Sequence, residues 1–209
     1  MRDAIPFLAT GVALGLSAGF FPGPLMALVA SQTLRHGPGE GAKAAFAPLL
    51  TDGPILVLST LLLARLSAHP RFLGLVSLLG GAFLLFLAYE NLTARGIEVD
   101  SGEETPRSVR KGILVNALSP HPYLFWITVG APTILKGLEG GLLPPAAFAG
   151  GFLGCLVGAK LLVAVLVGRS RRFLAGRTYL LLVRILGGAL AAYAVVLFRD
   201  GYRLLGGTG

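Results

Sequence analysis

The sequence predicts an all-α integral membrane protein whose six transmembrane helices form two inverted three-helix repeats. Its composition is the first observation: 54% of the 209 residues are hydrophobic and only 13% are charged, whereas soluble domains carry about 25% charged residues. The second is a series of six apolar stretches, each near the roughly 20 residues that a helix needs to cross the hydrocarbon of a bilayer. The third is a Pro-x-Pro sequence in the first helix of each predicted half, at Pro22 to Pro24 and at Pro120 to Pro122.

The six predicted spans make the whole chain, residues 1–209, a single transmembrane domain. Pro70 precedes the third span, Gly96 follows it, and Pro144-Pro145 opens the fifth, where the missing N–H of proline costs nothing. The loops between the spans are too short for a soluble catalytic domain, so we expect the protein not to be an enzyme. The spans are predicted at residues 5–34, 42–64, 72–94, 112–135, 146–168 and 179–198.

The spacing of the spans divides the chain into repeat one, residues 1–95, a cytoplasmic loop, residues 96–111, and repeat two, residues 112–209. Each repeat has an odd number of spans, so the second must enter the membrane upside down relative to the first. Of the 18 Lys and Arg residues, ten lie on the side of the 96–111 loop, six on the opposite side and two inside spans. Because basic residues concentrate on the cytoplasmic side, we predict a multi-pass protein of the plasma (inner) membrane with both termini on the non-cytoplasmic side. The same bias accounts for the net charge of +8, which therefore does not indicate a nucleic-acid partner.

The two Pro-x-Pro sequences, Pro22-Gly23-Pro24 and Pro120-His121-Pro122, are expected to break the first and fourth spans. Each proline removes a backbone donor, and the residue before it is pushed out of the α region. Freed backbone groups inside a membrane are tolerated only within protein or beside a watery cavity. Paired breaks at matching positions of inverted repeats point to a transporter's binding site. The alternative is that both are packing kinks without function.

Two charged residues lie deep inside predicted spans, Asp52 in the second and Lys160 in the fifth. Each costs about 2.5–3.5 kcal/mol at the centre of a membrane helix, so each should face the protein interior with a partner. One interpretation is a static Asp52–Lys160 ion pair that holds the halves together. In the other, Asp52 takes a proton or a substrate ammonium, while Lys160 is its counter-charge or binds a substrate carboxylate.

Three polar residues near the second break complete the candidate substrate-binding or coupling site: Asn116, Ser119 and His121. Asn116 precedes the break by one turn and could bond freed backbone or a ligand, and His121 could relay protons near neutral pH. His121 has no His or Cys companion at ligand spacing, so we expect no metal site and no cofactor. The single cysteine likewise excludes an intramolecular disulfide. Glu90 is predicted to pair with Arg184 at the membrane surface.

Motifs in each of the first four spans carry a resemblance to a known family. They are the glycine-rich approach to Pro22-Gly23-Pro24, then Arg35, Gly37 and Gly41, the pair Thr51-Asp52, the stretch from Gly81 to Tyr89, and Asn116-Ala117-Leu118-Ser119-Pro120-His121-Pro122. Together they resemble the lysine exporter (LysE/RhtB-type) family of bacterial amino-acid export translocators over nearly the whole chain. The sequence departs from the family's usual Asn, Lys and Ala at Ser119, His121 and Pro122, which changes the polarity and charge of the second break.

We therefore expect a secondary transporter that exports a small polar metabolite, an amino acid or a derivative, by proton exchange. Proton coupling is inferred because the sequence has no GxxxxGK[ST] motif for nucleotide binding. Two alternatives remain open: an inorganic-cation exporter of the same superfamily that uses Asp52 and His121, and a membrane subunit without transport of its own. The expected partners are the small-molecule substrate, protons and the lipid bilayer, and homo-oligomerisation is left open.

Overall fold

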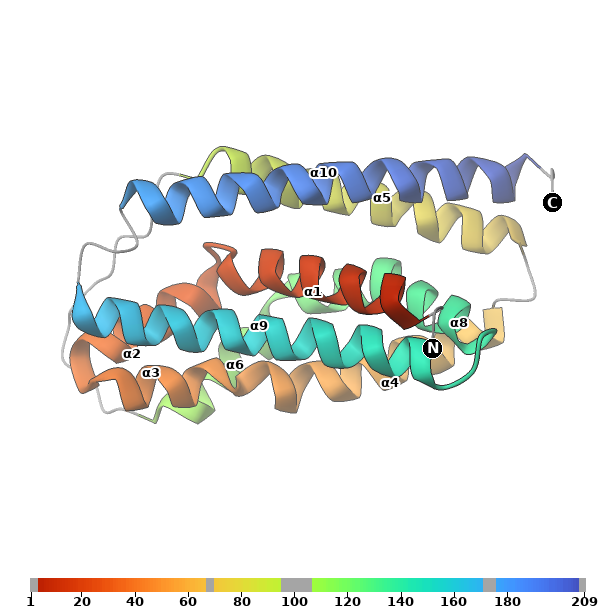
Figure 1. Ribbon diagram of the computed structural model, residues 1–209. Helices are drawn as coiled ribbons and strands as arrows, with labels where there is room; N and C mark the ends of the chain where they lie inside the picture. The colour runs from red at the N-terminus through yellow and green to blue at the C-terminus, as the bar shows by residue number, and fades with distance from the viewer. Residues whose placement is uncertain (1–3, 67–69, 95–106, 171–175, 207–209) are drawn as a thin grey trace.

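The computed structural model describes residues 4–66, 70–94, 107–170 and 176–206, and within these ranges all regular secondary structure is helical. Most of the helices have a proline within their first turn, where proline is tolerated. The order is α1 (Ala4–Phe20), α2 (Pro24–His36), α3 (Pro38–Ala45), α4 (Ala47–Leu66), α5 (Pro70–Leu92), α6 (Ser108–Leu118), α7 (Pro120–Phe125), the π-helix η1 (Trp126–Gly130), α8 (Ala131–Leu138), α9 (Leu143–Arg169) and α10 (Arg177–Leu205) (Figure 1).

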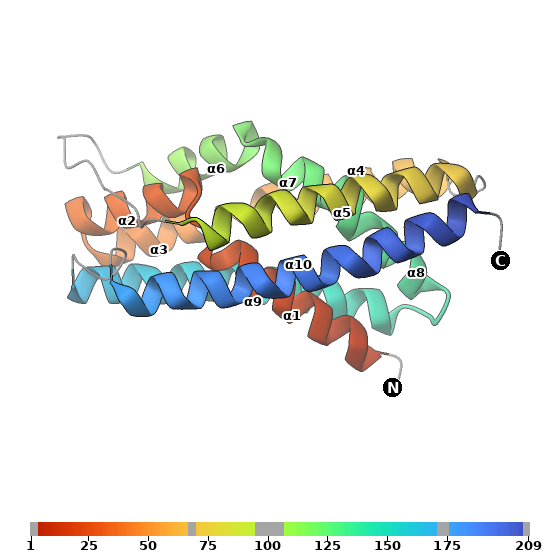
Figure 2. The same ribbon diagram turned by 90° about the horizontal axis from the view of Figure 1, so that it is seen from above.

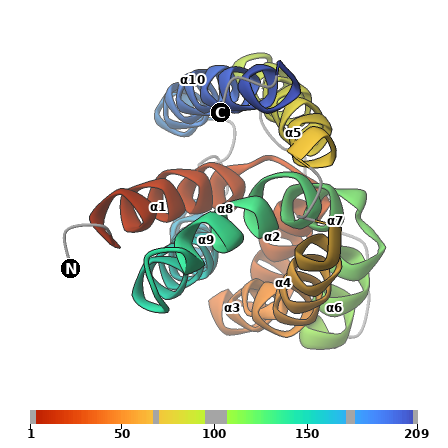
Figure 3. The same cartoon turned by 90° about the vertical axis from the view of Figure 1, so that its right-hand side faces the viewer.

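The helices pack as a long bundle in which two partnerships dominate. α5 and α10 lie side by side and form one layer, and α1 packs along α9 in the remainder of the molecule (Figures 1 and 3). α4 packs against the series α6, η1 and α8. The beginning of α1 and the end of α10 lie at the same end of the bundle, as the view from above also shows (Figure 2).

Four helices are long and apolar enough to cross a membrane: residues 38–65, which join α3 to α4, and α5, α9 and α10. α1 and α2 pass the same test only as a pair, bent by 60° at residues 21–23, which gives up to five spans among the described residues. The predicted fourth span, residues 112–135, is divided among α6, α7, η1 and α8. The molecule is thus an all-helical, multi-pass membrane protein, and a sixth crossing remains a prediction.

The interface between α1 and α9 depends on three glycines one turn apart. A Cβ atom at Gly11 or Gly15 would overlap the backbone carbonyl oxygen of Phe148 or Phe152, and one at Gly19 would lie 2.6 Å from the Cβ of Ala159. Small residues let membrane helices approach this closely, so that van der Waals packing replaces the hydrophobic effect that lipid cannot supply. The fixed approach places the end of α1 directly against the middle of α9.

The first chain break lies at residues 21–23, between α1 and α2. Gly23 has an extended backbone (φ −94°, ψ −177°), and Pro24 then opens α2. This is the conformation that a following proline imposes on its predecessor. α1 therefore ends inside the protein, with its last carbonyl groups available to side chains.

The second break lies one residue before the predicted Pro-x-Pro position. Ser119 has φ −75° and ψ 134°, while Pro120 and Pro122 are both within α7. The first four N–H groups of a helix have no intrahelical acceptor, so a proline at the first or third position sacrifices nothing. The prolines thus begin a new helix, and the residue before them is the one that leaves the α conformation.

A π-helical segment, Trp126–Gly130, precedes Pro132 in α8. A proline inside a helix removes one hydrogen bond and collides with the carbonyl four residues back, and a wider turn is one way of absorbing that conflict. The segment carries Trp126, which is fully buried. The stacked rings of Phe125 and Phe152, 4.4 Å apart at their centroids, join α7 to α9 beside it.

Several predicted boundaries need correction. Ser108 begins α6, so residues 108–111 of the predicted cytoplasmic loop are helical, and the acidic part of that loop lies outside the described residues. The predicted second span, residues 42–64, begins inside a separate helix, α3, which starts after Gly37, and continues through α4. Gly37 has φ +92°, a conformation that side chains other than glycine rarely adopt, and it ends α2 as well as opening α3.

Candidate functional site

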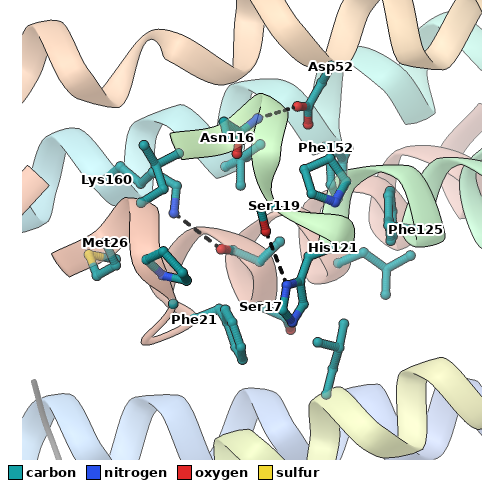
Figure 4. A pocket seen from close by; sticks show the side chains of 18 of the residues that line it. Ser17, Phe21, Met26, Asp52, Asn116, Ser119, His121, Phe125, Phe152 and Lys160 are labelled. Carbon is teal, nitrogen blue, oxygen red and sulfur yellow. Dashed lines mark hydrogen bonds between the residues drawn. The ribbon is translucent and has the colours of Figure 1, made fainter. Parts of the chain in front are cut away.

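A cavity of about 100 Å³ lies where the two chain breaks meet α4, α5, α9 and α10 (Figure 4). A single buried water needs about 10–15 Å³ of such space, so the cavity has room for several waters or one small solute. Its wall is largely apolar, with Phe21, Phe125 and Phe152 among the rings that face it. The polar side chains in the wall are those of Ser17, Asp52, Asn116, Ser119, His121 and Lys160.

Asp52 enters the cavity wall from α4 and is only 3% exposed. Its carboxylate oxygen Oδ1 accepts a hydrogen bond of 2.8 Å from the side-chain amide of Asn116 and lies 3.3 Å from the Thr51 hydroxyl. The same amide group donates to the Thr51 hydroxyl oxygen at 2.7 Å. Asn116 belongs to the last turn of α6, so the carboxylate is tied to the helix that ends at the second break.

Lys160 enters from α9 and is 4% exposed. Its ammonium donates to the backbone carbonyls of Ala18, at 3.4 Å, and Gly19, at 3.2 Å, and the Tyr179 hydroxyl donates to the carbonyl of Phe20 at 2.9 Å. The last four carbonyls of a helix have no intrahelical donor, and a cation is favoured at this negative end. Lys160 and Tyr179 therefore satisfy the end of α1 that the first break exposes.

Asp52 and Lys160 do not form an ion pair within 4 Å; each is bound instead to the end of a different broken helix. The interpretation as a static pair that locks the repeats together is therefore not what the contacts show. Both charges nevertheless line the same cavity (Figure 4). A solute between them would meet a carboxylate on one side and an ammonium on the other.

His121, in the first turn of α7, connects the cavity to α5. Its ring nitrogen Nδ1 lies 3.2 Å from the Ser119 hydroxyl, and Nε2 lies 3.7 Å from a carboxylate oxygen of Glu90. The rings of Phe21, Phe83 and Phe86 surround the imidazole, with centroids 5.3, 6.3 and 6.4 Å away. Glu90 was predicted to pair with Arg184; the structure places its carboxylate beside His121, and Arg184 is exposed.

The nine predicted site residues divide into two groups. Seven line the cavity: Gly23, Pro24, Asp52, Asn116, Ser119, His121 and Lys160. Pro22 and Pro120 do not line it and act through the backbone conformation beside them. The sequence analysis assigned Glu90 to pairing at the membrane surface, although an acidic residue late in an apolar span is also a signal for a functional site. The sequence analysis missed the aromatic rings, which carry no signal that separates them from packing residues.

The two ends of the bundle differ. At the end where α1 begins and α10 ends, a vestibule of about 1130 Å³ includes the ion pair Lys136–Asp200, at 3.6 Å. At the opposite end, the Ser108 hydroxyl lies 2.8 Å from the side-chain oxygen of Gln32 and 2.7 Å from a Glu40 carboxylate oxygen. These contacts tie α2, α3 and α6 together. The vestibule therefore lies at the termini, and the polar cluster at the end from which α6 starts.

Comparison with known proteins gives one match. A model of the family described as LysE type translocator matches residues 16–201. No match was found among curated proteins or among solved structures. In the part of the chain that the structure describes, no group of three or more His, Cys, Asp or Glu side chains is placed to hold a metal ion.

Proposed function

Because the chain belongs to the LysE type translocator family, we propose that it exports an amino acid or a related small polar metabolite across the plasma membrane in exchange for protons. The observation that carries the proposal is the central cavity, which brings one buried carboxylate and one buried ammonium to the two helix breaks. Buried ionisable residues in a membrane mark substrate or proton pathways. Their arrangement supports a secondary transporter.

The polar groups of the cavity fit a zwitterion. Lys160 has three N–H donors and uses two contacts on the carbonyls of α1, which leaves a donor for a substrate carboxylate. The first turn of α2, including Leu25 and Met26, also faces the cavity, and the N-terminal end of a helix favours an anion. Asp52 lies in the same wall and would accept the substrate ammonium or a proton.

The helix contacts support two inverted repeats. The proposed repeats match α1 with the α6–α8 series, α4 with α9, and α5 with α10. Under this match, the contact between α1 and α9 corresponds to the contact between the α6–α8 series and α4, and both contacts are present. α5 and α10 correspond to each other and pack as well. Lys160 on α9 binds the end of α1, and Asp52 on α4 binds Asn116 at the end of α6, which is the same relation.

We expect fusions of a reporter enzyme to place residue 209 and the start of the chain outside the cytoplasm, and residues 96–106 inside. The reason is the ten-to-six distribution of Lys and Arg. The vestibule would then open to the outside, and the polar cluster of Gln32, Glu40 and Ser108 would close the cytoplasmic end. Paired phosphatase and fluorescent-protein fusions at both sites measure this. Active phosphatase within 96–106 would reverse the proposed orientation.

The direct test of function is a transport assay in liposomes loaded with a mixture of radiolabelled L-amino acids. We expect efflux of at least one amino acid that accelerates when the outside is made acidic, because inward proton movement would drive export. Protein-free liposomes and a protonophore provide the controls, and the protonophore should remove the acceleration. Efflux that ignores the pH difference would contradict proton exchange, and no efflux of any amino acid would contradict the substrate class.

A further inference from the structure

Ser119, His121 and Glu90 form a line of three polar side chains that leads away from the cavity. Ser119 lies in the cavity wall, whereas Glu90 lies near the end of α5 and is not part of that wall. The His121 ring stands between them, with one nitrogen facing each neighbour. Its Nε2 and the facing Glu90 Oε2 are both buried atoms without a hydrogen bond. Buried polar atoms left unpaired in this way indicate a functional arrangement or a missing partner.

We propose that Ser119, His121 and Glu90 are a proton-transfer path from the central cavity to the end of α5. The proposal rests on the proton exchange proposed above and adds the route by which the proton leaves. The Ser119 hydroxyl gives its proton to Nδ1 of His121, the Nε2 proton passes to the Glu90 carboxylate, and Ser119 takes a replacement proton from the cavity. One proton has then moved from the cavity to Glu90, and the imidazole is left as its other tautomer. It returns to the original tautomer when Nδ1 gives a proton to a water molecule and Nε2 takes one from water.

The distances make the path conditional on conformation. The 3.2 Å contact of Nδ1 is within hydrogen-bond range, whereas 3.7 Å between Nε2 and Glu90 is beyond it. α5 belongs to the first repeat and α7 to the second, so a movement between repeats changes this distance. Proton transfer would be allowed only in the state that shortens it. Such a gap would prevent a continuous leak of protons.

The surroundings of His121 favour transfer through the side chains. Phe21, Phe83 and Phe86 occupy the space around the ring and limit the room for a parallel chain of water. Glu90 faces the ring from α5, and Asp52 from α4 and Lys160 from α9 line the cavity on the other side of Ser119. Tyr123, on the same helix, donates its hydroxyl to the carbonyl of Ala117. Among the described residues, Glu90 is thus the carboxylate that faces Nε2, at 3.7 Å.

The test compares His121→Gln and Glu90→Gln with the unaltered protein in liposomes, using the radiolabelled amino-acid mixture and an internal pH dye. We expect both variants to lose about a hundredfold in pH-driven efflux and in coupled proton movement, since a positioned proton-transfer group contributes about 10²–10⁴-fold. Exchange of labelled for unlabelled amino acid without a pH difference should be unchanged in Glu90→Gln, because exchange needs binding and reorientation only and Glu90 lies outside the cavity wall. Glu139→Gln, an exposed carboxylate at the end of α8, is the matched control and should leave both rates unchanged.

Each other outcome overturns the path. If both variants kept the pH-driven efflux rate of the unaltered protein, protons would leave by another route and the path would be wrong. The proposed proton exchange would still be supported in that case if Asp52→Asn abolished pH-driven efflux. Loss of exchange together with pH-driven efflux in Glu90→Gln would assign Glu90 to folding or substrate binding. An unaltered protein that ignores the pH difference would contradict the proposed proton exchange and this path together.

Discussion

Asp52→Asn should abolish export driven by a pH difference while the protein still folds and inserts. Asparagine has nearly the same shape, and its side-chain oxygen can accept the bond that Asn116 donates to the carboxylate at 2.8 Å. What it lacks is a group that binds and releases a proton. We expect the pH-driven rate in liposomes to fall by at least about a hundredfold, the lower range for loss of a positioned acid–base group.

The matched variant for this experiment is Lys160→Met, which removes the other buried charge of the cavity and keeps the length of the side chain. Because Lys160 is proposed to bind the substrate rather than to carry the proton, we expect Lys160→Met to raise KM for the amino acid and to retain acceleration by external acid. Equal pH-driven rates in Asp52→Asn and the unaltered protein would remove Asp52 from coupling. Its hydrogen bonds to Asn116 and Thr51 would then have a structural role only.

Gly15→Ala should strongly destabilise the protein through a single added methyl group. The new Cβ would overlap the carbonyl oxygen of Phe152 and lie 2.9 Å from its Cα, and backbone atoms of a neighbouring helix cannot move aside cheaply. Forcing extra volume into such an interface costs about 1–3 kcal/mol. We expect a lower midpoint of thermal unfolding in detergent and less monodisperse protein. Transport should fall as well, because α1 carries the carbonyls that Lys160 binds.

Gly154→Ala provides the comparison, since Gly154 lies on α9 and a Cβ there would meet nothing within 4 Å. Alanine is favoured over glycine inside a helix by roughly 0.5–1 kcal/mol, so this variant should be as stable as the unaltered protein or slightly more stable. If Gly15→Ala and Gly154→Ala melted at the same temperature as the unaltered protein, the close approach of α1 to α9 would be wrong.

The local parts of the candidate site were predictable from the sequence. Prolines act on the residue before them, and Gly23 and Ser119, which precede Pro24 and Pro120, have extended backbone conformations. Asp52 and Lys160 were recognisable as charges inside apolar stretches. The second break moved to Ser119 because Pro120 and Pro122 can stand in the first turn of a helix. This tolerance applies to any helix start, but the prediction had treated the prolines only as helix breakers.

Partners between helices were not predictable in the same way. Nothing in the order of residues shows that Asn116 faces Asp52, or that Glu90 lies beside His121 rather than Arg184. These contacts depend on how each helix is rotated about its axis, which packing against several neighbours decides. The angle of 60° between α1 and α2 was not predictable either, because the prolines indicate where the first span is interrupted but not how far the two helices bend.

The charges of the Asp52 carboxylate and the Lys160 ammonium determine how the proposed carrier would respond to the membrane potential. Moving one elementary charge across a membrane potential of 100 mV changes the free energy by about 2.3 kcal/mol. With the carboxylate ionised and the ammonium protonated, the two fixed charges of the cavity sum to zero, so an empty carrier would reorient without sensing the voltage. A proton on Asp52 leaves one net positive charge, which a negative cytoplasm would draw inward. Export would then respond to membrane voltage through the returning, protonated carrier and not through the step that carries a zwitterion out.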